Sequence, residues 1–205
     1  MSTPTPTPAP EETGFDPLVF WIQHKTKIVL LIALLVVGLM TFGVSEYLRV
    51  SKAHAAQALF AKAESVDDYR KLISNYPGTA PAGNAHLKLA EKLREEGKFD
   101  ESTATLKAFT EKYSEHQLIS GAWTSMAANL EAQGKPEEAL STYQKVSTSY
   151  ANSFSAPAAL LAQARLLVSQ KKNAEAERVY EQVMTQYQDN MAAQQAAQEI
   201  RRLKK

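Results

Sequence analysis

The feature that most constrains this 205-residue sequence is a repeat with a period of 37 residues, which runs through residues 53–205. Four tyrosines mark the same position of successive units, and several apolar columns keep the same step. Agreement of six separate columns on one period is not expected by chance, and a fixed period of about 20–50 residues is typical of repeat architectures. The clearest columns are Tyr76/Tyr113/Tyr150/Tyr187, Leu72/Phe109/Val146/Val183, Tyr69/Leu106/Tyr143/Tyr180 and Ala53/Ala90/Ala127/Ala164.

Helix-breaking residues divide each unit into two predicted helices. In the second full unit, the pattern predicts a first helix over 120–133 and a second over 136–150. Gly134 suits the left-handed cap that ends a helix, and Pro136 suits a first helical turn. Each helix has one apolar stripe, so a single hairpin would leave apolar faces in water, whereas stacked hairpins cover them.

This two-helix unit resembles a tetratricopeptide repeat. The unit is about three residues longer than the usual 34, and the third unit has Lys171 where the motif has glycine and Gln163 where it has an apolar residue. The resemblance implies a helical solenoid that binds other proteins. The matching residues of the second full unit are Trp123, Met126, Ala127, Leu130, Gly134, Ala139, Tyr143 and Val146.

The repeats fill the chain to its last residue. Residues 53–76 supply a partial unit, whose first helix, around Leu48 to Phe60, can be continuous with the segment before it. Residues 190–205 occupy the next first-helix position and are polar enough to serve as a terminal cap. The predicted fold class is therefore all-α: a single N-terminal transmembrane helix, then a tetratricopeptide-repeat-like α-solenoid of about 3.5 hairpins with a capping helix.

The transmembrane helix is predicted from an uncharged apolar run between Ile28 and Ser45. Its 18 residues cover about 27 Å as a helix, close to the thickness of a bilayer's hydrocarbon core. A buried helix of a soluble protein would carry charged or strongly polar residues on one side, and this run has none. A cleavable signal peptide is the alternative, because Ala53-His54-Ala55 has the small-x-small pattern, but charged residues separate that site from the run.

Three parts are expected along the chain. Residues 1–14 are predicted to be a disordered Pro/Thr-rich tail, with no basic residue of the kind that flanks proline-rich docking motifs. Residues 15–52 form a juxtamembrane segment and the span, at about 28–47, and residues 53–205 form the repeat domain. Two Lys or Arg residues flank each side of the run, so the positive-inside rule does not decide orientation.

The composition argues against several classes of chemistry. The chain has no cysteine, so thiolate catalysis and zinc–cysteine sites are excluded. Its four histidines show no metal-binding spacing, and no phosphate-binding glycine motif or nucleophile motif occurs. The net charge of +1 gives no bias toward nucleic acid. We expect no catalytic residue, no metal, no cofactor, no small-molecule substrate and no nucleic-acid partner.

Protein binding is the function that the resemblance implies. In tetratricopeptide repeats the first helices line an inner surface, and matching its positions to this sequence predicts a groove for extended or unfolded polypeptide. An acidic tail would instead need a clamp of Lys and Arg. The predicted groove residues are Asn84, Leu87, Glu91, Arg94, Thr124, Ala128, Glu131, Leu161, Arg165 and Val168.

The layout of the chain resembles the YfgM-like family of ancillary subunits of the SecYEG translocon. The similar parts are Phe20-Trp21 before the span, Tyr47 after it and the segment from Ala53 to Phe60. The resemblance implies a single-pass protein of the bacterial inner membrane, with a cytoplasmic N-terminus and periplasmic repeats. Its implied partners are translocon subunits, periplasmic chaperones or emerging polypeptides. The alternative is a structural scaffold of an envelope or cytoplasm-facing membrane complex that handles no clients.

Overall fold

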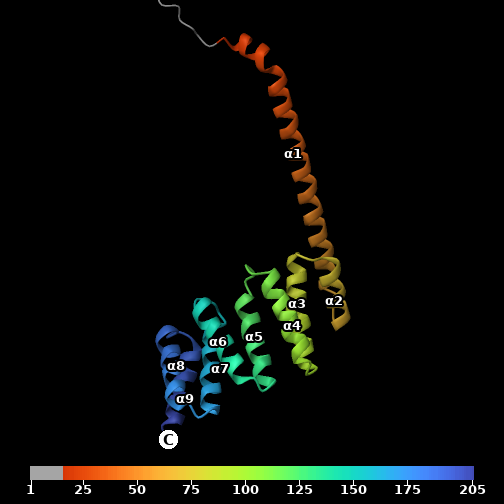
Figure 1. The fold of residues 1–205 in the computed structure, drawn as a ribbon. Helices are drawn as coiled ribbons and strands as arrows, with labels where there is room; N and C mark the ends of the chain where they lie inside the picture. Colours follow the sequence, from red (N-terminus) through yellow and green to blue (C-terminus); the bar gives the residue numbers. More distant parts are fainter. Residues whose placement is uncertain (1–15) are drawn as a thin grey trace, which may run out of the picture. The chain divides into compact units, whose positions relative to one another are not determined.

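The computed structural model describes residues 16–205, and all regular structure in that range is helical. The Pro/Thr-rich tail expected at residues 1–14 lies outside the described residues. The chain divides into two units with a boundary between Val50 and Ser51, and each unit is described by itself. The helices are α1 Pro17–Phe60, α2 Val66–Asn75, α3 Ala80–Glu95, α4 Phe99–Lys112, α5 Ile119–Ala132, α6 Pro136–Ser149, α7 Ala156–Ser169, α8 Asn173–Gln186 and α9 Met191–Leu203 (Figure 1).

The N-terminal unit consists of the part of α1 that carries the apolar run. Its most apolar stretch has no buried residue, and among residues 16–205 α1 is the one helix whose length and composition would allow it to cross a membrane. Thr41 donates a hydrogen bond to the carbonyl of Gly38 at 2.9 Å, and Ser45 donates to Phe42 at 2.8 Å. Both hydroxyls of the run therefore have a partner within the helix.

In the second unit, helices α2 to α9 pack against one another in chain order (Figure 1). The pairs α3/α4, α5/α6 and α7/α8 are three complete hairpins, while α2 is the second helix of a partial unit and α9 fills the first-helix position after the last hairpin. This arrangement confirms the predicted all-α repeat fold. The helices expected at residues 120–133 and 136–150 differ from α5 and α6 by at most one residue at either end.

A residue in the left-handed conformation follows the first helix of each complete hairpin. Gly97 has a φ of 74° and Gly134 a φ of 71°. The next residue donates its N–H to the carbonyl five positions earlier at 2.8 to 2.9 Å, which is the Schellman arrangement. Lys171, which replaces the glycine in the third hairpin, keeps both features with a φ of 62°.

The apolar columns of the repeat form the core between stacked helices. Phe109, Val146 and Val183 of one column are fully buried. Tyrosines at the ends of the units connect neighbouring repeats: the Tyr187 hydroxyl donates to the carbonyl of Ala151 at 2.6 Å, 36 residues earlier. The regular core fixes the order of the first helices, which carry the predicted groove residues.

Candidate protein-binding site

The ten predicted groove residues lie on α3, α5 and α7, the first helices of the three complete hairpins. We call the surface of these helices that carries them the first-helix face. Four of the ten are exposed and charged: Glu91, Arg94, Glu131 and Arg165. Asn84, Leu87, Thr124, Ala128 and Val168 are half-buried, and Leu161 is buried.

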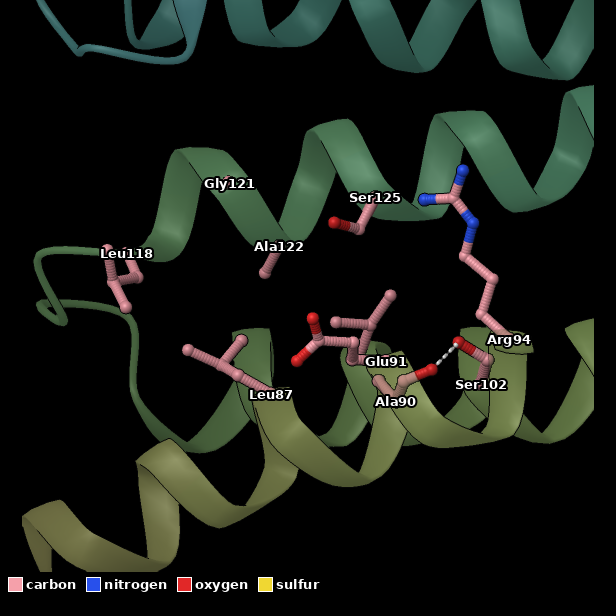
Figure 2. Close-up of a pocket in the computed structure, with 10 residues that line it drawn as sticks. Leu87, Ala90, Glu91, Arg94, Ser102, Leu118, Gly121, Ala122 and Ser125 are labelled. Carbon is pink, nitrogen blue, oxygen red and sulfur yellow. Dashed lines mark hydrogen bonds between the residues drawn. The ribbon is translucent and has the colours of Figure 1, made fainter. Parts of the chain in front are cut away.

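A pocket of about 300 Å³ opens on this face where α3, α4 and α5 meet. Leu87, Glu91 and Arg94 extend from α3, and Ala122 and Ser125 of α5 lie opposite them (Figure 2). The pocket therefore has apolar walls with few polar groups, as binding pockets commonly do. Its lining residues are Leu87, Ala90, Glu91, Arg94, Ser102, Leu106, Leu118, Gly121, Ala122 and Ser125.

Charges of both signs border the pocket, and within residues 16–205 only the negative one is paired. Glu91 accepts a charge-assisted hydrogen bond from the ammonium of Lys88 at 2.7 Å. Arg94 forms no ion pair with any other residue in the range 16–205. At the pocket's edge, 39% of the Leu118 side chain is exposed. The pocket thus offers a cation and apolar surface to a partner.

Further along the face, a tyrosine ring connects the second helix of a hairpin to the first. The hydroxyl of Tyr143 on α6 donates to the carboxylate of Glu131 on α5 across 3.3 Å. Burial of the ring, with the negative charge of Glu131 acting in the same direction, raises the pKa of Tyr143 to about 12. The positive charges of Arg165 and Arg94 oppose that rise in pKa.

A second pocket, of about 320 Å³, lies between the beginnings of α7 and α9. Phe154 and Met191 line it and are 70% and 82% exposed, and the buried Leu161 lines it as well. A Cβ atom at Gly121, in the wall of the first pocket, would be 3.7 Å from Cζ of Phe154. The exposed phenylalanine therefore lines the second pocket and lies close to the wall of the first.

The structure brings together only part of the predicted set. Leu87, Glu91 and Arg94 share the first pocket, and Leu161 lines the second. Val168 packs against the core of the last hairpin, and the Thr124 hydroxyl donates to the carbonyl of Ser120.

Sequence reasoning missed most of the wall of the first pocket and the exposed residues of the second. One signal was present, because Leu106 interrupts a column that otherwise contains only tyrosine. The missed residues of the first pocket are Ala90, Ser102, Leu106, Leu118, Gly121, Ala122 and Ser125. In the second pocket every lining residue except Leu161 was missed, including the exposed Phe154 and Met191.

The fold consists of stacked helical hairpins with an apolar, partly charged face. It places the protein in the class of helical-repeat scaffolds for protein–protein interaction, which are typically non-catalytic. Within residues 16–205 no three His, Asp or Glu side chains are grouped as a metal site would need. Residues 19–204 match the tetratricopeptide repeat-like domain. The chain belongs to this family.

Solved structures with a similar fold agree with that assignment. The type III secretion translocator chaperone SycD of Yersinia enterocolitica matches with a TM-score of 0.51 at 13% identity, covering 68% of this chain and 98% of SycD. A tetratricopeptide repeat protein of Parabacteroides merdae matches with a TM-score of 0.56 at 14% identity, covering 76% of this chain and 60% of that protein. At these identities the likeness concerns the fold. No curated protein matches this chain.

Proposed function

We propose that this protein is a membrane-anchored accessory factor whose first-helix face holds extended polypeptide close to the bilayer. The observation that carries this proposal is the pocket between α3 and α5, which combines apolar walls with the guanidinium of Arg94, unpaired among the residues that the structure describes. An extended peptide can place an apolar side chain in such a pocket and a carbonyl or carboxylate against the cation. The remaining predicted groove residues, from Asn84 to Val168, would contact the flanking peptide.

The anchor in this proposal is α1, with the span at about residues 28–47 and the repeat domain at residues 53–205. Support comes from the length of α1, its exposed apolar side chains and its internally bonded hydroxyls. Anchoring would raise the local concentration of the repeats near any complex in the same membrane, so weak contacts would be sufficient.

We further propose that the membrane is the bacterial inner membrane, with the N-terminus in the cytoplasm and the repeats in the periplasm. The layout that resembles the YfgM-like family supports this placement, and with it a role beside the Sec translocon and periplasmic chaperones. The partners would be translocon subunits, chaperones or emerging polypeptides. A translocator chaperone, SycD, has a similar fold, so the fold suits such a role.

Protease accessibility and site-specific crosslinking test the two parts of this proposal. In intact spheroplasts that produce the full chain, added protease should digest residues 53–205, and protection of those residues would refute the periplasmic orientation. A photo-crosslinking amino acid at Glu91 should capture polypeptides, whereas the same group at the exposed Gln144, on a second helix, should not. Equal capture from both sites, or a single fixed stoichiometric complex, would instead favour a structural scaffold.

A further inference from the structure

One column of the repeat changes residue type at the first pocket. The column contains Tyr69, Tyr143 and Tyr180, all buried, but the second of its four positions is Leu106. Leu106 lines the pocket of about 300 Å³. The first-helix face is therefore hollow where the column has leucine in place of the larger tyrosine.

In the next repeat, the ring of Tyr143 fills the space that corresponds to the pocket beside Leu106. The ring packs in a cluster with Ala127, Ala139, Ala159 and Ala162. Each of these alanines is 37 residues after one of four residues that line the pocket at Leu106. The four lining residues are Ala90, Ser102, Ala122 and Ser125.

The last hairpin repeats the same arrangement. Tyr180 packs in a cluster with Ala164, Ala176 and Ala196, which are 74 residues after Ala90, Ser102 and Ala122. Small residues thus surround this place in three successive repeats. Two of the repeats fill it with a phenol ring, and the repeat of Leu106 leaves it unfilled.

We propose that the pocket beside Leu106 receives a tyrosine side chain from a bound polypeptide, in the position that the chain's own tyrosines occupy in the following repeats. The proposal deepens the proposed function and rests on it, because it requires the first-helix face to bind protein. The occupant follows from the molecule itself: the same backbone scaffold, lined by the same kinds of small residues, already binds a phenol ring twice.

The charged residues at the pocket indicate which sequence around the tyrosine would bind best. The phenol of Tyr143 faces the carboxylate of Glu131, whereas the residue 37 positions earlier is Arg94. The phenol oxygen of a bound tyrosine would therefore accept a hydrogen bond from a guanidinium. Since Glu91 is paired with Lys88 and Arg94 has no ion-pair partner among the described residues, the charge available at the pocket is positive. The favoured partner is an extended segment in which an acidic residue follows the tyrosine.

The test uses the full chain in lipid nanodiscs with isotope-labelled leucine methyl groups. The probe is a nine-residue peptide of glycine and serine with a central Tyr-Glu pair, and the comparison peptides replace the tyrosine by alanine or the glutamate by lysine. We expect the Tyr-Glu peptide to shift the methyl signals of Leu106 and Leu87 saturably. The alanine peptide should leave them in place, and the lysine peptide should bind at least threefold more weakly.

The decisive variant is Leu106→Tyr, which restores the residue type of the column. It should keep or raise the urea midpoint of unfolding and abolish the peptide-induced shifts at Leu87. Tyr143→Leu is the reciprocal variant, which should open a second place for a tyrosine and add a second set of shifts at Leu140 and Leu166. Both variants exchange residue types that the repeat already accepts at this position.

Three other results would contradict the tyrosine assignment, and they differ in what they imply for the proposed function. Saturable shifts of equal size with the alanine peptide would overturn the tyrosine assignment and leave a peptide-binding face. No saturable binding of any of the peptides at the first-helix face would remove support from both. Self-association of the wild-type chain that Leu106→Tyr abolishes would assign the pocket to a second copy of the chain instead.

Discussion

The side-chain amide of Asn129, fully buried in α5, donates a hydrogen bond to the Ser102 hydroxyl of α4 at 2.9 Å. Ser102 in turn donates to the carbonyl of Ala90 on α3 at 2.7 Å. This chain of hydrogen bonds joins three consecutive helices beneath the first pocket. The two later repeats offer no counterpart, because alanine occupies the Ser102 position in both of them.

Ser102→Ala should therefore destabilise the protein, although alanine is the residue type of the later repeats. The change leaves the buried amide of Asn129 with only its longer contact to Thr103, at 3.3 Å. We expect the free energy of unfolding to fall by about 1–2 kcal/mol in urea denaturation. In an Asn129→Leu background, the same change should have almost no effect, since no buried amide then lacks a partner. An equal cost in both backgrounds would contradict the coupling.

Lys171→Gly should stabilise the last hairpin. A side chain in the left-handed region costs about 1–2 kcal/mol, which exceeds the extra backbone entropy of glycine. We expect a gain of about 0.5–1 kcal/mol in the free energy of unfolding. Gly134→Ala is the matched control at the equivalent turn, and it should lose about 1 kcal/mol. Denaturation curves of the two variants should shift in opposite directions, and a shared direction would refute the explanation.

Stability should fall on mild acidification because of His86. Burial lowers the pKa of His86, and the positive charge of Lys112 adds to that effect while a hydrogen bond to the backbone of Thr105 opposes it. The unfolded chain then binds a proton more readily than the folded chain. The contribution of neutral His86 to the free energy of unfolding is complete above the ordinary histidine pKa of about 6.5. It is lost as the pH falls below that value toward the lowered pKa of the folded state.

The variant His86→Leu isolates this effect, since leucine stands at the equivalent position, Leu160, in the last hairpin. Between pH 7.5 and about 5.5, the wild type should lose more stability than the variant, as measured by urea denaturation at each pH. Parallel pH profiles would show that His86 does not contribute. His116, whose pKa burial also lowers, remains in both proteins.

Tyr143 should resist ionisation in alkaline solution, because burial and the carboxylate of Glu131 raise its pKa to about 12. Subtracting the ultraviolet titration curve of the Tyr143→Phe variant from that of the wild type isolates the ionisation of Tyr143. We expect this ionisation to occur at a higher pH than that of the chain's other tyrosines. Glu131→Gln should lower the pKa of Tyr143 only in part, since burial is the larger cause. A return to the ordinary value in that variant would mean that the carboxylate dominates. The stabilisation from the neutral phenol should disappear as the pH rises from about 10 toward 12.

A charge in the apolar run of α1 should weaken membrane insertion. Leu35→Arg places a guanidinium in the middle of the run, at a cost of about 2.5–3.5 kcal/mol on an insertion scale. Leu59→Arg, on the same helix but beyond the run, should have little effect. The measurement is the fraction of full-length chain that resists alkaline extraction from membranes. Equal extraction of the two variants would argue against a span at residues 28–47.

The sequence alone determined the repeat, the helix boundaries and the turn positions of this protein. Those features depend on local chemistry: the 37-residue columns set the apolar stripes, and Gly97 and Gly134 permit the left-handed turns. Lys171 shows the limit of such reasoning, because a lysine takes the left-handed conformation that glycine prefers and keeps the hydrogen bond of that turn.

Only the tertiary structure decided which residues of the first-helix face are hollow and which are filled. Leu161 satisfied the same periodic rule as Leu87, yet neighbouring helices bury Leu161 and leave Leu87 half-exposed in the wall of the first pocket. The cavity at Leu106 results from side chains of three helices that meet across stacked hairpins. The volume of a cavity depends on the sizes and positions of all the side chains around it. The residue pattern of a single helix does not determine how side chains from other helices pack against it.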